Sequence, residues 1–103
     1  MVRDGKMAEQ VGSRVLYEDP SIRVWLLELQ PGESSGWHKH TCEYMYVTTR
    51  AGKTQTEYID GRIEPQDDTV GTAVHRRTDP GHRLVNKGTE VYQNIVIEFL
   101  DQQ

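Results

Sequence analysis

The sequence predicts an all-β fold of two antiparallel sheets, which form a sandwich or a barrel. Short segments rich in aromatic and β-branched residues recur at roughly 8–12-residue spacing, and turn residues separate them. No segment has the 3.6-residue apolar periodicity of an amphipathic helix. The 103 residues are sufficient for one domain with a modest core.

Four strands are predicted in the first half of the chain. The first two each end shortly before a proline, which lacks the N–H that a strand interior needs. The third is expected to be a short extended stretch, and the fourth reads Tyr-Met-Tyr-Val-Thr-Thr, a typical strand composition. In order, these strands are residues 14–18, 22–29, 37–40 and 44–49.

The second half of the chain alternates strands with turns. Ala51-Gly52 marks one turn, and Asp60-Gly61 is a strong hairpin signal. Residues 65–68 are predicted to form a loop, Asp79-Pro80-Gly81 to break the chain, and Asn86-Lys87-Gly88 to form another turn. The predicted strands are residues 54–59, 62–64, 70–76, 82–85 and 91–99.

Composition excludes several classes of partner. The net charge is −4 and the basic residues are scattered, so nucleic-acid binding has no electrostatic support. No apolar run approaches the roughly 18 residues that a membrane span needs. The first ten residues have no apolar segment typical of a secretory signal, and the single cysteine fits a reducing compartment. The sequence therefore predicts a cytoplasmic protein.

Residues 1–13 are polar and aperiodic, which predicts a flexible N-terminal arm before a domain of residues 14–103. The hydrophobic fraction is only 35%, so a monomer would have a small core. We therefore expect a homodimer that buries additional strand surface.

Three of the four histidines lie in two clusters that one metal ion explains. His38-Lys39-His40 on an extended strand directs both imidazoles to one face, because side chains alternate with a period of two. His82 and a nearby carboxylate, Glu43, complete a mixed nitrogen and oxygen ligand set. Imidazole and carboxylate suit Fe, Mn, Ni, Zn or Cu, and the sequence does not choose among them.

The spacing of these residues resembles that of the cupin family of small β-barrels. Five residues separate Gly32 from His38, and 11 separate His40 from Gly52. Ten residues separate Gly71 from His82, and three separate His82 from Asn86. The resemblance covers about residues 31–86, and it implies a single-domain, cupin-like jelly-roll barrel with a metal ion inside.

The chain departs from the family pattern at two points. Pro80-Gly81 directly precedes His82, whereas the family has its Pro-x-Gly earlier. Glu43 is one residue early, and on an uninterrupted strand Tyr44 shares the face of the histidines instead. Glu43 reaches the metal only if the chain bulges at Thr41-Cys42. Two sites remain open: three histidines with Glu43, or three histidines with open positions and Tyr44 nearby.

Other residues are candidates for the pocket. Tyr44 is a possible proton donor, although barrel packing also explains it. His75 is a possible acid or base, and Arg76 a possible clamp for a substrate carboxylate; solvated positions on a strand are the alternative for both. Asn86 either orients His82 or forms a turn with the residues after it.

The resemblance implies a metal-dependent enzyme that acts on a small polar or carboxylate-bearing molecule. With iron the reaction would be that of a dioxygenase, and with manganese or zinc that of an isomerase or lyase. Because a fold does not determine a function, two alternatives remain. One is a non-catalytic module that binds a metal or a metabolite, and the other is a structural protein with a vestigial pocket.

Overall fold

The computed structural model describes residues 12–77 and 81–100, and these form eight strands and no helix. The strands are β1 (Arg14–Glu18), β2 (Ile22–Leu29), β3 (Tyr44–Arg50), β4 (Gly52–Tyr58), β5 (Ile63–Asp68), β6 (Ala73–Arg76), β7 (His82–Asn86) and β8 (Tyr92–Phe99). Within these residues no helix is long and apolar enough to cross a membrane.

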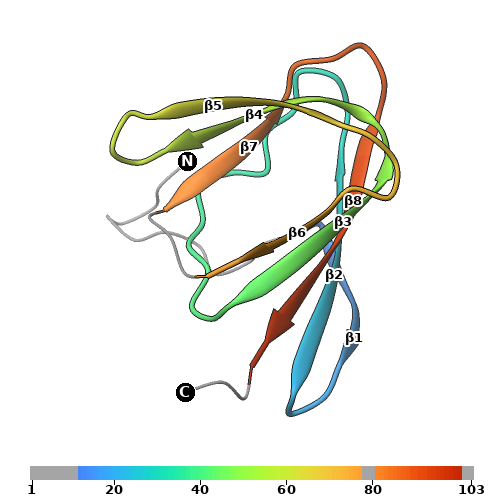
Figure 1. Ribbon diagram of the computed structural model, residues 1–103, viewed down its shortest axis with the longest axis vertical. Helices are drawn as coiled ribbons and strands as arrows, with labels where there is room; N and C mark the ends of the chain where they lie inside the picture. Colours follow the sequence, from blue (N-terminus) through green and yellow to red (C-terminus); the bar gives the residue numbers. More distant parts are fainter. Residues whose placement is uncertain (1–11, 78–80, 101–103) are drawn as a thin grey trace.

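Two antiparallel sheets face each other and enclose the interior of the domain (Figure 1). The larger sheet has the order β1-β2-β8-β3-β6, and the smaller has the order β5-β4-β7. Apart from the pairs β1-β2 and β4-β5, sheet neighbours are not consecutive in sequence, as in a jelly roll, where strands cross between sheets. The predicted all-β fold of two antiparallel sheets is therefore confirmed.

The predicted strands are mostly confirmed, and the clearest differences lie around β5 and β6. Residues 65–68, predicted as a loop, are the last four residues of β5. Pro65 is tolerated there because β5 is an edge strand and pairs only with β4. The predicted strand 70–76 starts only at Ala73, because Gly71 has a φ of 89° and belongs to a turn.

The predicted hairpin at Asp60-Gly61 joins β4 to β5. Gly61 adopts a φ of 97°, a conformation that side chains other than glycine rarely take. The Tyr58 N–H donates to the Arg62 carbonyl at 2.9 Å, and the Asp60 carboxylate accepts from the Arg62 N–H at 3.0 Å. The turn sets the register of β4 with β5, and on its other side β4 pairs with β7, where Tyr58 lies opposite His82.

The segment before β3 lies along β7 as an irregular fourth strand of the smaller sheet. Isolated bridges pair Ser34 with Val85 and His38 with His82. The predicted extended stretch of residues 37–40 is thus held by backbone hydrogen bonds, although only His38 within it has bridge pairing. This pairing brings the two histidine clusters of the sequence side by side.

Most of the predicted N-terminal arm, and Asp79-Pro80 of the predicted break, lie outside the described residues. At the end of the arm, the Ser13 N–H donates to the Leu26 carbonyl. The Ser13 hydroxyl accepts from the Glu28 N–H at 3.0 Å. The arm therefore joins the edge of the larger sheet at its last residue.

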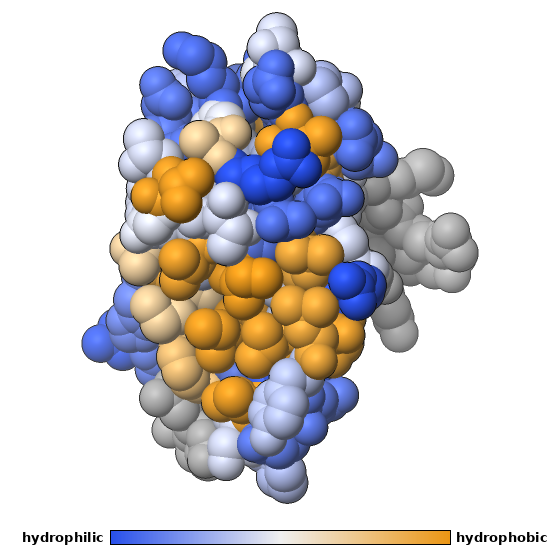
Figure 2. Space-filling view, turned by 90° about the vertical axis from the view of Figure 1, so that its right-hand side faces the viewer, coloured by the Kyte–Doolittle hydropathy of each residue, from blue (hydrophilic) through white to orange (hydrophobic). Residues whose placement is uncertain are grey.

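The two faces of the larger sheet have an unusual polarity. Its inner face mixes apolar residues such as Trp25, Leu27 and Val96 with buried Asn94 and Glu98. Most of the alternate residues of β2, β3 and β8, which face outward, are apolar and only partly covered; among them are Val24, Leu26, Met45, Val47, Ile95, Ile97 and Phe99. Figure 2 shows apolar side chains gathered in one patch on this side of the molecule.

Asn86 closes the loop between β7 and β8, as the turn alternative predicts. Its side chain is fully buried, and its amide nitrogen donates to the carbonyls of Leu29 at 2.9 Å and Glu90 at 2.8 Å. Its amide oxygen accepts from the Gly88 N–H at 2.9 Å. One side chain therefore ties β2 to the loop that begins β8.

We expect Asn86→Ala to lower the free energy of unfolding by about 3 kcal/mol, because it leaves buried backbone groups without partners. Urea denaturation followed by circular dichroism measures this change. Gln30→Ala, which removes an exposed amide, is the control and is expected to change stability little. Equal stability of the two variants would contradict this role of Asn86.

Candidate metal centre

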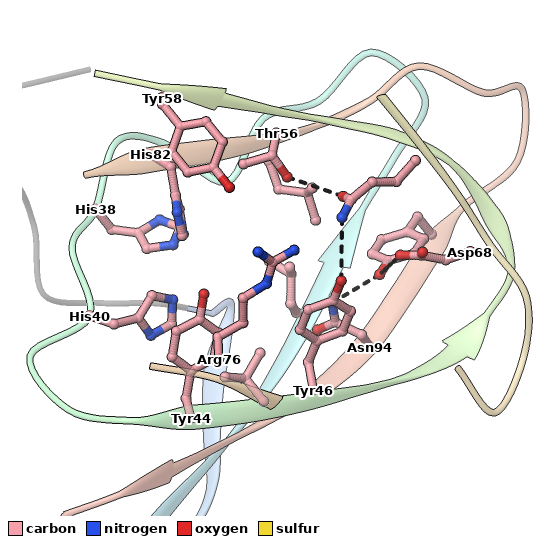
Figure 3. Close-up of a pocket in the computed structure, with 15 residues that line it drawn as sticks. His38, His40, Tyr44, Tyr46, Thr56, Tyr58, Asp68, Arg76, His82 and Asn94 are labelled. Carbon is pink, nitrogen blue, oxygen red and sulfur yellow. Dashed lines mark hydrogen bonds between the residues drawn. The ribbon is translucent and has the colours of Figure 1, made fainter. Parts of the chain in front are cut away.

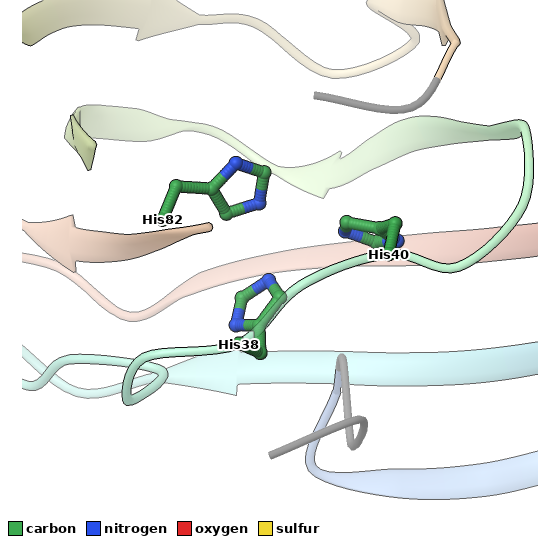
Figure 4. Close-up of side chains that lie close together, drawn as sticks. All are labelled: His38, His40 and His82. Carbon is green, nitrogen blue, oxygen red and sulfur yellow. The ribbon is translucent and has the colours of Figure 1, made fainter. Parts of the chain in front are cut away.

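His38, His40 and His82 lie together inside the barrel (Figure 4). Each offers one ring nitrogen, and these three atoms all lie within 4.8 Å of one another. The three side chains are between 3% and 7% exposed. The structure therefore brings together the three histidines that the sequence singles out.

Backbone pairing sets the position of this cluster. His38 and His82 exchange two backbone hydrogen bonds, each 2.9 Å long, across an antiparallel bridge. Directly opposite residues of such a bridge project their side chains to the same side. His40 follows two residues after His38, and its ring centroid lies 5.2 Å from that of His38 and 5.3 Å from that of His82.

Burial keeps two of these imidazoles neutral. It lowers the pKa of His40 to about 2, with further lowering from His38 and His82. Burial also lowers the pKa of His82 to about 4, and the positive charge of Arg76 adds to this effect. Neutral imidazole is the form that binds a metal ion, so the donor set is ready at neutral pH.

Neighbouring groups orient the rings. His38 Nδ1 lies 3.0 Å from the Gly36 carbonyl, and if this nitrogen donates, Nε2 is left with its lone pair toward the cluster. His40 Nδ1 lies 3.9 Å from a carboxylate oxygen of Glu98, which is 2% exposed. Trp25 Nε1 donates to Glu98 at 2.7 Å and holds that carboxylate in place. Partners of this kind orient metal-ligating histidines in many proteins.

Tyr44, and not Glu43, shares the interior with the histidines. The Tyr44 ring stacks on His40, with ring centroids 3.5 Å apart and planes at 10°. Glu43 Oε1 lies 3.0 Å from His75 Nε2, and Glu43 Oε2 lies 3.5 Å from an Arg77 nitrogen. The bend at Thr41-Cys42 does not turn Glu43 inward, so the strand alternation holds and Glu43 does not join the cluster.

His75 and Arg76 are neighbours on β6, and their side chains point to opposite faces of the sheet. Arg76 lines the pocket that contains the three histidines, and Figure 3 shows its guanidinium group in the middle of that pocket. His75 is about half exposed and pairs with Glu43. Of the two residues that sequence analysis proposed here, the structure brings only Arg76 to the histidines.

The pocket extends from the histidines, past Arg76, to a polar inner end. Its lining residues are Leu27, His38, His40, Tyr44, Tyr46, Thr56, Tyr58, Gln66, Asp68, Arg76, His82, Leu84, Tyr92, Asn94 and Val96. Within residues 12–77 and 81–100, Arg76 makes no ion pair with a carboxylate. A cation of this kind in a pocket is suited to an anionic group of a ligand.

Three buried polar residues, Asp68, Asn94 and Glu98, are not among the site residues that the sequence predicts. Asp68 falls in the predicted loop 65–68, and Asn94 and Glu98 fall in the predicted strand 91–99. A signal is nevertheless present, because residues 92, 94, 96 and 98 of β8 are Tyr, Asn, Val and Glu, whereas residues 95, 97 and 99 are apolar. Such a strand has its more polar face inside the barrel.

The donor set fits a divalent metal ion. Three buried imidazoles, two of them with lowered pKa values, offer ring nitrogens within 4.8 Å of one another. Three histidines with open positions form a ligand set typical of catalytic zinc and related metals. Of the two sites left open by the sequence, this geometry favours the one without Glu43.

Comparisons with solved structures identify the architecture. A cupin domain from Bordetella pertussis matches with a TM-score of 0.76 and 24% identity, over 82% of this chain and 88% of that one. A conserved protein with a double-stranded β-helix domain from Klebsiella pneumoniae matches with a TM-score of 0.69 and 15% identity, over 100% and 85%. A cupin-like protein from Thermotoga maritima matches with a TM-score of 0.67 and 18% identity, over 85% and 67%.

Comparisons of sequence add no further relatives. No protein-family model matches the chain, and no curated protein matches it. The similarity to solved structures therefore supports the fold, whereas the roles of individual residues depend on their geometry in this chain.

The lowered pKa values predict how the metal-free protein responds to acid. Below pH 6.5 the unfolded chain protonates its histidines while folded His40 and His82 stay neutral, so stability is full above pH 6.5 and falls as the pH drops toward 4. We expect a loss of about 1 kcal/mol per pH unit for each histidine. Urea denaturation with a chelator between pH 7.5 and 5 measures this loss.

The control for this prediction is a pair of variants. The double variant His40→Gln with His82→Gln is expected to flatten the dependence of stability on pH, and His75→Gln, at an exposed position, is expected to keep it. A double variant with the same slope as the original protein would contradict the lowered pKa values of His40 and His82.

Proposed function

Since the chain has the cupin fold, we propose that it binds one divalent metal ion through His38, His40 and His82. We further propose that it acts on a small carboxylate-bearing molecule beside that ion. The observation that carries the proposal is the convergence of three buried imidazoles whose ligand atoms lie within 4.8 Å of one another. Fe, Mn, Ni, Zn and Cu all suit such ligands.

A metal ion with three protein ligands keeps positions for water or substrate. When bound, it would supply Lewis acidity to a substrate oxygen, as in the dioxygenase, isomerase and lyase reactions that the resemblance to cupins implies. We leave Glu43 and His75 out of the proposed site, because they pair with each other on the outer face of the larger sheet.

We assign Arg76 the role of anchoring the carboxylate of the ligand. Its guanidinium group lies in the pocket and is close enough to His82 to lower the pKa of that histidine. Guanidinium binds carboxylate through two parallel hydrogen bonds, which fixes the orientation of a small acid. A carboxylate held there would keep the rest of the ligand within reach of the histidines.

Tyr44 is the proposed proton donor of the site. Its ring is 4% exposed and stacks on His40, which ties the position of the phenol to that of a proposed metal ligand. A tyrosine hydroxyl beside a bound substrate either donates a proton or holds a substrate oxygen by a hydrogen bond. Both roles depend on the same contact with the ligand.

The alternative function is a non-catalytic module that binds the same metal ion and a metabolite. The composition of the pocket wall favours it, because carboxylates commonly serve as catalytic acids or bases and Asp68 is the sole carboxylate among the described lining residues. Asp68 lies at the inner end and not among the histidines (Figure 3). Recovery of a bound ligand without chemical change would support this alternative.

We expect the protein to contain about one divalent ion per chain when expressed with a suitable metal, and His82→Ala to contain less than about 0.2. Elemental analysis of the purified proteins measures this. The control is His75→Ala, which removes an exposed histidine and is expected to retain the ion. Equal metal content in the two variants would exclude the proposed ligand set.

We expect Arg76→Gln to weaken the binding of short carboxylic acids, with butanoate as the probe, by about tenfold or more. Calorimetric titration of the metal-loaded protein measures this change. Arg77→Gln is the matched control, because Arg77 is 80% exposed and pairs with Glu43. Butanoate binding that is unaffected by Arg76→Gln would refute the role of Arg76.

We also propose that two copies of the chain pair through the outer face of the larger sheet. Strands β2 and β8 carry apolar residues on both faces, a pattern typical of strands that are buried on both sides. Because the centre of this face is uncharged, two copies would not repel each other across it. Ile97 lies near its centre, paired with Val24 on one side and Met45 on the other.

Analytical ultracentrifugation is expected to give a dimer for the original protein and a monomer for Ile97→Lys, since a lysine there would place a charge in an apolar interface. Val70→Lys is the control, because Val70 is 66% exposed and precedes β6 in a turn. A monomeric original protein at micromolar concentration would refute the proposed pairing.

A further inference from the structure

The inner end of the pocket contains polar groups that the proposed metal site does not use. Asp68 on β5 is 8% exposed, Asn94 on β8 is 3% exposed, and both line the pocket. Figure 3 shows these two residues on the far side of Arg76 from the histidines. The pocket therefore has two polar ends with a cation between them.

The hydrogen bonds at this end have a definite direction. The Tyr92 hydroxyl donates its single proton to Asp68 Oδ2 at 3.0 Å. The 3.0 Å contact between Tyr92 and Asn94 must then be a bond that the Asn94 amide nitrogen donates. This leaves Asn94 Oδ1 as a buried acceptor that has no hydrogen-bond partner.

Asp68 has little compensation for its charge. Its one side-chain hydrogen bond within residues 12–77 and 81–100 comes from Tyr92, and no lysine, arginine or histidine of those ranges pairs with it. Buried carboxylates and amide oxygens are normally satisfied by donors. The Asp68 carboxylate and Asn94 Oδ1 therefore both suit a hydrogen-bond donor of the ligand.

We propose that Asp68 and Asn94 form a second binding subsite, which takes an ammonium group of the ligand. The ligand would then be a small amino acid or other amino-carboxylate, with its carboxylate at Arg76 and its ammonium group at the inner end. An ammonium group matches the site best, because it offers three donors and a charge opposite to that of Asp68. This inference rests on the proposed function, since it uses Arg76 as the carboxylate anchor.

The test compares pairs of acids that differ only at the far end. The probes are 3-aminopropanoate, 4-aminobutanoate and 5-aminopentanoate, each paired with the acid of the same length in which methyl replaces ammonium. Dissociation constants are measured by calorimetry on the metal-loaded full chain. At least one amino acid is expected to bind tenfold or more tightly than its methyl counterpart.

Two variants assign this preference to the subsite. Asp68→Asn keeps an acceptor for the Tyr92 hydroxyl but removes the charge, so we expect the amino acid to lose its tenfold advantage while its methyl counterpart binds within twofold of the original. Asn94→Ala is expected to reduce the same advantage, which keeps the test decisive if Asp68→Asn does not fold. Thermal unfolding of each variant reports on folding.

The outcomes separate the inference from the proposed function. If the methyl acids bind through Arg76 and no amino acid binds more tightly, the subsite is refuted while the carboxylate anchor stands. If an advantage of the amino acids survives both Asp68→Asn and Asn94→Ala, the subsite is likewise refuted. If no acid of either kind binds, the proposed carboxylate anchor fails, and the inference fails with it.

Discussion

The reciprocal backbone pairing of His38 with His82 is the constraint on which the site depends. These residues are 44 positions apart in the sequence, and two 2.9 Å hydrogen bonds place them directly opposite each other. Because the pairing belongs to the backbone, it fixes the two side chains on one side whatever they bind. His40 then needs only the two-residue alternation of an extended chain to complete the cluster. The histidine cluster is thus a consequence of how the segment before β3 lies along β7.

The same barrel has an unusually polar interior and an apolar outer face on its larger sheet. Its interior contains histidines, Arg76, Asp68, Asn94 and Glu98, whereas the outer face of the larger sheet is apolar. A polar interior gives a small protein less burial energy than an apolar one would. The arrangement is explained if the interior is a ligand site and the outer face is covered by a second copy. The proposed ligand site and the proposed pairing of two copies thus have the same origin, the distribution of polar and apolar residues over the two faces of the larger sheet.

The parts of this structure that local spacing determines could be predicted from the sequence. They include the strands, the hairpin at Asp60-Gly61 and the shared face of His38 and His40. The direction of Glu43 could be predicted only as two alternatives, because it depends on whether the bend at Thr41-Cys42 changes the alternation, and it does not. Asp68 could not be placed, because Pro65 is tolerated only on an edge strand and the sheet order is not visible in the sequence. Glu98 was missed because its partners, Trp25 and His40, come from distant segments.

Anomalous diffraction at the zinc edge, from crystals grown with Zn²⁺, tests the central claim most directly. The account predicts one strong peak among the ring nitrogens of His38, His40 and His82, with the Glu43 carboxylate still beside His75. A chain that carries zinc at another group of residues, or that includes Glu43 among the ligands, would contradict it.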